Sequence, residues 1–243
     1  MLSYSPTIKT SLKLFKDTGK VIWSKSSIGV DAMTNLLVPI LVALTPGCLT
    51  LLKFLRWARS LWIAPLIGGG GWLLALLLRI PILMLNNTFV KDVVLNAFIA
   101  SLMAGIFEEL TRYFVIKLPF IKMFKHDGAV AVGLGWGLTE AVLIYVVNVA
   151  VLAPVFNYTW VDLLPGAFER NTAILMHVTL SLIVFHAINA GFKWLLTAVL
   201  THTAFNVVGV LTLFYIANVW IAELVLFCVG VAVFLYVFKF LKK

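Results

Sequence analysis

Long apolar stretches, separated by short polar or basic segments, dominate the hydropathy pattern from about residue 29 onward. A transmembrane helix needs about 20 consecutive apolar residues, and these stretches lack the alternating ten-residue pattern of a membrane β-barrel. The pattern therefore predicts an all-α, polytopic membrane helix bundle. Its seven expected spans lie at roughly residues 29–51, 61–84, 92–118, 128–152, 170–190, 194–216 and 218–240.

The first 28 residues differ from the rest because they are polar and basic. Lys9, Lys13, Lys16 and Lys20 are spaced as on one face of a helix, with apolar side chains between them. Such a segment is typical of an amphipathic helix at a membrane surface, and a basic tail fits equally well. We therefore expect a basic N-terminal segment, residues 1–28, followed by one seven-span membrane domain, residues 29–243.

Composition and charge exclude two classes of protein. Of the 243 residues, 62% are hydrophobic and 12% are charged, against about 45–50% and about 25% in soluble domains. The net charge of +9 indicates contact with membrane lipid and not with nucleic acid, because basic residues of membrane proteins gather on the cytoplasmic side. The basic loops predict a cytoplasmic C-terminus and an N-terminus outside. The pattern predicts neither the host membrane nor the oligomeric state.

Polar side chains interrupt four of the expected spans. A charged group at mid-bilayer costs about 2.5–3.5 kcal/mol, so such residues normally face the bundle interior and mark a functional site. At a rise of about 1.5 Å per residue, these side chains lie at similar depth, and we expect them in one layer. They are Glu108, Glu109 and Arg112 in the third span, Glu140 in the fourth, His177 in the fifth, and His202 and Asn206 in the sixth.

This set of side chains predicts a divalent metal site, with zinc as the expected ion. Imidazole and carboxylate groups bind zinc and similar ions, and a hydrolytic site needs about three protein ligands and an open position for water. The ion lowers the pKa of its water, and a nearby carboxylate takes the proton. Glu108 or Glu109 can supply that carboxylate. The structural alternatives are a buried ion pair that fixes helix register and histidines that tie helices together.

Other unusual positions are expected to be structural. Gly133 and Gly137 lie close to the stripe of Glu140 in the fourth span, which predicts close approach of a neighbouring helix. Four glycines at 68–71 predict close helix packing or a hinge. Arg79 is expected near the outer interface, where its side chain can reach water. Residues 153–170, which include Arg170, are expected to form an outside loop.

Four segments, GIFEELTRYFVIK, GLGWGLTEAVLI, ERNTAILMHVTLSLIV and WLLTAVLTHTAFN, together resemble the YhfC-type intramembrane metalloproteases over about residues 30–240. That family is similar to PrsW, to the CAAX-prenyl (Abi, CPBP) proteases and to the non-catalytic anterior-pharynx-defective subunit of γ-secretase. The resemblance implies catalytic roles for Glu108, Glu109, Arg112 and Asn206, and metal binding by His177, His202 and Glu140.

One position departs from the family pattern. The fourth span of the family usually reads GHG before its glutamate, whereas this chain reads GWG, with Trp136. Two functions therefore stay open. The first is an intramembrane metal-dependent peptidase that acts on a transmembrane or membrane-associated polypeptide. The second is a non-catalytic membrane scaffold, similar to the γ-secretase subunit. A transporter is a third function, which the lack of paired broken helices disfavours.

Overall fold

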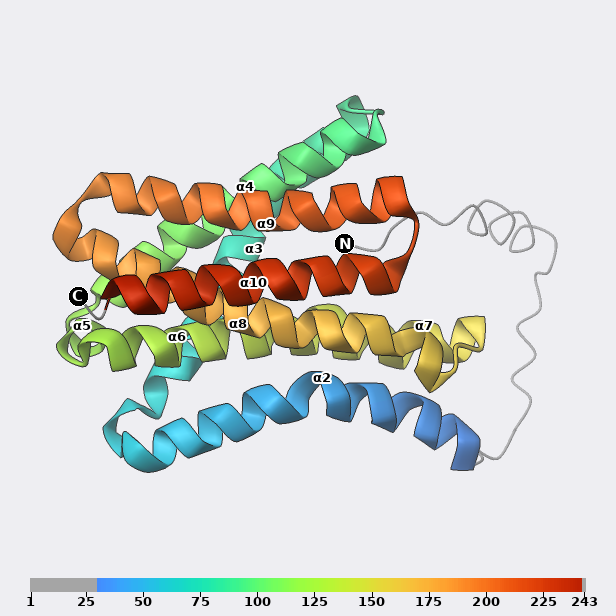
Figure 1. The fold of residues 1–243 in the computed structure, drawn as a ribbon, viewed down its shortest axis with the longest axis horizontal. Coiled ribbons are helices and arrows are strands. Elements are labelled where there is room, and N and C mark those ends of the chain that lie inside the picture. Colours follow the sequence, from blue (N-terminus) through green and yellow to red (C-terminus); the bar gives the residue numbers. More distant parts are fainter. Residues whose placement is uncertain (1–29, 242–243) are drawn as a thin grey trace. The chain divides into compact units, whose positions relative to one another are not determined.

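A computed structural model describes residues 30–241, most of which lie in helices (Figure 1). Within these residues seven helical stretches are long and apolar enough to cross a membrane, and no strand occurs. The predicted all-α bundle is therefore confirmed, whereas the segment 1–28 lies outside the described residues. The helices are α2 (Val30–Trp57), α3 (Ile63–Phe89), α4 (Val93–Lys117), the short α5 (Pro119–Met123), α6 (Lys125–Glu140), α7 (Val147–Phe156), α8 (Trp160–Ala190), α9 (Phe192–Ile216) and α10 (Val219–Leu241).

The prediction of a long loop over residues 153–170 was wrong. Helix α7 continues to Phe156 and α8 begins at Trp160. Asn157 adopts the left-handed conformation that ends α7, with φ 53°, and Thr159 forms a capping box with Asp162 at the start of α8. These two local devices reverse the chain within three residues. As a result, α8 extends two to three turns further than expected and carries Arg170 inside the helix.

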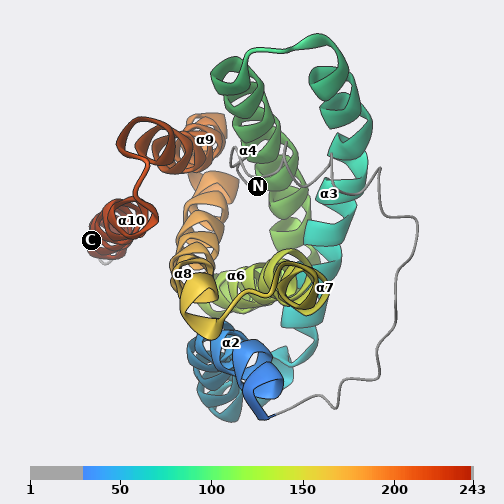
Figure 2. The ribbon, with the colours of Figure 1, turned by 90° about the vertical axis from the view of Figure 1, so that its right-hand side faces the viewer.

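Helix α6 lies between α3 and α8 and packs closely against both (Figure 2). A Cβ atom added at Gly133 would lie 2.6 Å from the Cα of Val178, and one at Gly137 would lie 2.8 Å from the Cα of Ile174. Only glycine permits this separation, because a side chain would overlap the backbone of α8. The predicted close approach at these glycines is confirmed, and the neighbour is the helix that carries His177.

The four-glycine run on α3 is also a packing feature. A Cβ at Gly68 would lie 2.3 Å from the carbonyl oxygen of Val132 in α6, and one at Gly71 would lie 2.7 Å from the ring of Trp136. Gly70 faces away, because nothing lies within 4 Å of its would-be Cβ. The run therefore sets the distance between α3 and α6.

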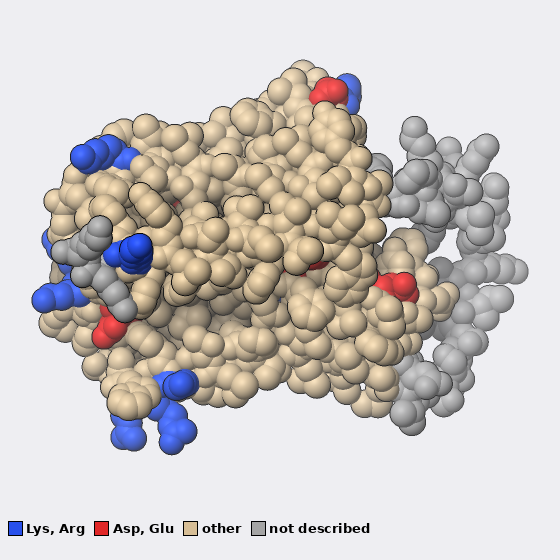
Figure 3. All heavy atoms as spheres, viewed as in Figure 1, with Lys and Arg blue, Asp and Glu red and all other residues tan. Residues whose placement is uncertain are grey.

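Basic side chains gather at one end of the helices (Figure 3). Helix α4 ends there with Lys117, α9 begins there beside Lys193, and α10 ends there beyond Lys239. This distribution is the one that the positive-inside rule associates with the cytoplasmic side. The orientation itself stays a prediction.

We expect Gly68→Ala to destabilise the protein by about 1–3 kcal/mol, because its methyl group would overlap the backbone of Val132. The matched control, Gly70→Ala, should leave stability unchanged or raise it by up to about 1 kcal/mol, because alanine favours helix. Thermal unfolding in detergent, followed by tryptophan fluorescence, measures both. Equal melting temperatures for the two variants would contradict the packing role.

Candidate active site

Polar side chains from five helices meet in the interior of the bundle. Hydrogen bonds connect Glu109, Arg112, Glu140, His177 and His202, and an ion pair with Arg112 adds Glu108, so six of the seven side chains expected in one layer do meet. Asn206 is half-buried one turn after His202 and makes no side-chain hydrogen bond to a described residue. The structure adds side chains that were not expected here: Trp72 and Arg79 from α3, Trp136 from α6 and Arg170 from α8.

Glu109 is held on both carboxylate oxygens. Nη1 of Arg112, one turn further along α4, lies 2.5 and 2.6 Å from them, and Nδ1 of His202 lies 2.6 Å from Oε1. All three side chains are buried. The guanidinium of Arg112 also lies over the ring of Trp136, 4.4 Å from its centroid. Of the two glutamates that could pair with Arg112, Glu109 is the one that does so closely.

Glu108 is held by residues from two other helices. Nη1 of Arg79 donates to its Oε1 over 2.6 Å, and the indole N–H of Trp136 donates to its Oε2 over 2.9 Å. The expectation that the Arg79 side chain reaches water is not met, because it is 13% exposed and pairs with Glu108. Helices α3 and α4 are antiparallel neighbours, and side chains lean toward the N-terminus of their own helix. Arg79 and Glu108 therefore lean toward each other.

Glu140, the last residue of α6, accepts three hydrogen bonds. Arg170 donates to its Oε1 over 2.9 Å, and Trp72 and His177 contact its Oε2 at 3.0 and 2.8 Å. Arg170 also pairs with its neighbour Glu169. The prediction of Arg170 in an outside loop was wrong, because α8 begins earlier than expected. A π-helical stretch, Ala141–Val146, follows Glu140 directly, and such stretches often occur at functional sites.

The charges at the centre balance. Each of Glu108, Glu109 and Glu140 has a different arginine as its closest ion-pair partner, namely Arg79, Arg112 and Arg170. A buried ion without a partner is strongly destabilising, so this pairing is what lets the carboxylates lie inside the bundle. The structural alternative of ion pairs and hydrogen-bonded histidines is therefore realised here. It coexists with a group that could bind metal.

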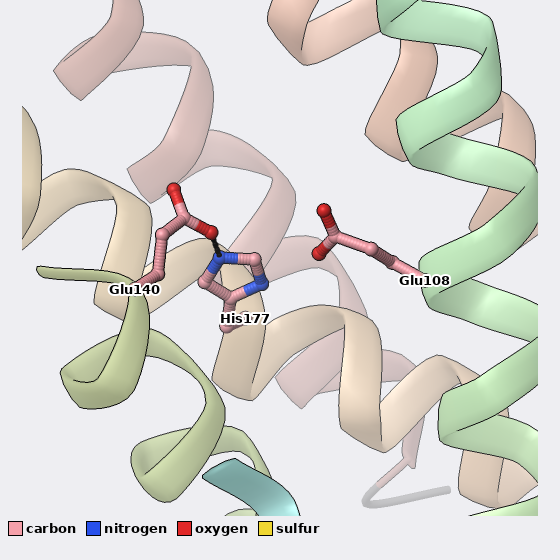
Figure 4. A group of neighbouring side chains, drawn as sticks. All are labelled: Glu108, Glu140 and His177. Atoms are coloured by element: carbon pink, nitrogen blue, oxygen red, sulfur yellow. Dashed lines mark hydrogen bonds and ion pairs between the residues drawn. The ribbon is translucent and has the colours of Figure 1, made fainter. Parts of the chain in front are cut away.

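Glu108, Glu140 and His177 could hold a metal ion, because one ligand atom of each lies within 4.8 Å of the others. Figure 4 shows the imidazole between the two carboxylates, with Glu140 hydrogen-bonded to it. A carboxylate has about four acceptor positions. Glu108 accepts two hydrogen bonds and Glu140 accepts three, so both keep room for an ion. Two carboxylates and an imidazole fit a divalent ion such as zinc.

The second predicted histidine ligand lies beside the first. The ring centroids of His177 and His202 are 5.8 Å apart, in an edge-to-face arrangement. His202 contacts Glu109 through Nδ1 and makes no hydrogen bond through Nε2 to any described residue. Its metal-binding role stays a prediction, as do the roles of the other site residues.

Sequence reasoning missed four residues for different reasons. Arg79 did carry a signal, since it is a lone charge inside an apolar span. Arg170 was hidden by the misplaced start of α8. Trp136 was treated as a missing histidine, although its indole N–H reaches Glu108. Trp72 gave no signal that distinguishes it from an ordinary buried tryptophan.

One family model matches part of the chain. Residues 71–162 match the model described as YhfC intramembrane metalloprotease. The matched range is less than half of the chain, and it includes Glu108, Glu109, Arg112 and Glu140 but ends before both histidines of the site. The predicted resemblance is confirmed over that range. No curated protein matches the chain.

We expect Arg79→Gln to destabilise the protein by about 3–5 kcal/mol, because it leaves the buried Glu108 carboxylate without its cation. Adding Glu108→Gln to this variant should restore part of the lost stability, because the buried carboxylate that lacked a cation is then gone. Arg59→Gln, at an exposed arginine, is the matched control and should be neutral. Unfolding in detergent gives the stabilities of the wild type, the two single variants and the double variant, which together form a double-mutant cycle. Additive effects of the two single changes would show that Arg79 and Glu108 do not interact.

Proposed function

We propose that this integral, multi-pass membrane protein is a metal-dependent peptidase that hydrolyses a peptide bond within or near the bilayer. The observation that carries the proposal is the convergence of Glu108, Glu140 and His177, from three helices, within 4.8 Å. The match of residues 71–162 to an intramembrane metalloprotease family supports it. The matched family is one of proteases, and nothing in the match favours the scaffold alternative.

The proposed ligands are His177 and Glu140 from this group, together with His202, whose ring lies beside that of His177, and zinc is the expected ion. A bound ion of this kind would lower the pKa of its water and polarise a carbonyl group. Glu109 supports His202, because it accepts the Nδ1 proton and leaves Nε2 for the ion. A carboxylate behind a histidine is a common arrangement around catalytic zinc.

Glu108 is the proposed general base. Glu109 is less suited, because Arg112 and His202 already hold its oxygens. Glu108 lies in the same group as Glu140 and His177 and keeps free acceptor positions. Arg79 and Trp136 fix its carboxylate from two sides, which orients it toward a water at the site.

Asn206 is the proposed donor to the substrate. It lies one turn from His202 on α9, and its amide has no hydrogen-bond partner among the described residues. An amide one turn from a ligand can donate to the carbonyl oxygen as negative charge develops there. The substrate would be a transmembrane or membrane-associated polypeptide, because the site lies inside apolar spans. In the proposed orientation, the basic end of the helices lies on the cytoplasmic side.

We expect the purified protein to hold about one divalent ion per chain. His177→Ala and His202→Ala should each lose it, and His186→Ala, at a histidine outside the network, should retain it. Elemental analysis after exposure to zinc and removal of free metal measures the content. No ion above background in the wild-type protein would refute the metallopeptidase proposal.

We expect Glu108→Gln to lower peptidase activity by about 10²–10⁴-fold, the usual contribution of a general base. The matched control is Asp127→Asn, at an exposed carboxylate in the first turn of α6. The assay places each protein in liposomes with a pool of fluorogenic transmembrane peptides, with thermal unfolding as a check on the fold. Equal loss of activity in both variants would point to a general effect of removing a carboxylate and against Glu108 as the base.

A further inference from the structure

The two histidines of the site are in different hydrogen-bonding states. His202 uses only Nδ1, which lies 2.6 Å from Oε1 of Glu109, and its Nε2 is free of hydrogen bonds to described residues. His177 uses both ring nitrogens. Its Nδ1 lies 2.9 Å from Nη2 of Arg112, and its Nε2 lies 2.8 Å from Oε2 of Glu140. The two rings therefore differ in what they can offer an ion.

The contact with Arg112 fixes the tautomer of His177. A guanidinium group only donates hydrogen bonds, so Nδ1 of His177 must accept and carries no proton. The ring proton is then on Nε2, where it is donated to the Glu140 carboxylate. A proton on Nδ1 would point at an N–H of Arg112. No lone pair of the His177 ring is left over.

Binding of an ion to His177 is therefore incompatible with this hydrogen bond. A histidine binds a metal as neutral imidazole, through one nitrogen, while the other nitrogen carries the proton. Binding through Nε2 moves the proton to Nδ1, where it opposes the N–H of Arg112. Binding through Nδ1 needs an ion at about 2.0–2.1 Å from that atom, in the direction that Arg112 occupies. Either way, Arg112 must leave His177.

We propose that Arg112 gates ion binding at His177. In the metal-free protein it holds the imidazole in the tautomer that cannot bind, and an ion enters only when the Arg112–His177 hydrogen bond opens. This inference rests on the proposed metal-dependent function, because it concerns the same site. Arg112 acts here as a positioning residue for His177 and Glu109, in addition to its part in the ion pair.

The surroundings of Arg112 allow the gate to open without unpairing the arginine. Nη1 binds Glu109 separately from the Nη2 group that contacts His177. The ring of Trp136 supports the guanidinium from one face. Nη2 also lies 4.0 Å from Oε2 of Glu108, which is a second acceptor within a short movement. The Glu109 pair can therefore persist while Nη2 releases His177.

Zn²⁺ affinity tests the proposal, measured in detergent by competition with a chromophoric chelator. We expect Arg112→Lys to bind Zn²⁺ about tenfold or more tightly than the wild type, because a charge-assisted hydrogen bond no longer has to be broken. Lysine keeps the positive charge beside Glu109 but lacks the second donor group. The matched control is Arg59→Lys, at an exposed arginine that contacts none of the proposed ligands. Its affinity should match the wild type.

A second measurement needs no variant at the gate. Nitrogen-15 NMR of histidine-labelled, metal-free protein reports which ring nitrogen carries the proton. The chain has four histidines, so the spectrum is simple, and His177→Asn identifies the signal. We expect an unprotonated Nδ1 and a protonated Nε2 for His177. This measurement tests the proposal even if Arg112→Lys does not fold.

The outcomes separate the two proposals. Zn²⁺ binding by the wild type, with no gain in Arg112→Lys or with an Nδ1 proton on metal-free His177, overturns the gate and leaves the metal-dependent function standing. An equal gain in Arg59→Lys also overturns it, because the effect then follows from altering any arginine. No Zn²⁺ binding above the His177→Ala background in any protein overturns both.

Discussion

The requirement that every buried charge have a partner governs this structure. Each of Glu108, Glu109 and Glu140 pairs with an arginine, and two of these pairs join different helices, α4 to α3 and α6 to α8. Removing one partner of a buried pair costs about 3–5 kcal/mol, so the pairs resist any relative shift of these helices. His202 extends the same network to α9 through Glu109. The residues proposed for chemistry are therefore also the ones that hold the bundle in register.

These charge pairs form because glycines bring the helices close. Gly133 and Gly137 let α6 approach α8, and Gly68 lets α3 approach α6. With larger residues at these positions, the arginine and glutamate head groups would be held further apart. Lipid chains are as apolar as leucine, so packing of small residues and interhelical hydrogen bonds must drive association. The two kinds of contact support each other on α6, where Gly137 lies one turn before Glu140.

The sequence predicts the bundle and the layer, but not the pairing within the layer. Hydropathy alone predicts the spans. The depth of each polar residue within its span is enough to group the side chains of Glu108, Glu109, Arg112, Glu140, His177 and His202. The partners of these acids depend on finer features: the lean of Arg79 along α3 and the early start of α8 that carries Arg170 inward. Neither follows from apolar length alone. Trp136 shows the same limit, because its role as a donor to Glu108 depends on the α4–α6 distance.

Two requirements conflict at His177. A buried site is stable without an ion when every donor and acceptor is satisfied, whereas binding an ion needs lone pairs that are still available. Glu108 and Glu140 meet both requirements, because a carboxylate has more acceptor positions than they use. His202 meets both by contacting Glu109 through one nitrogen only. His177 cannot, since an imidazole has two nitrogens and both are engaged. In the proposed gate, the conflict between stability and ion binding therefore falls on the hydrogen bond from Arg112, which is the one contact that ion binding would exchange.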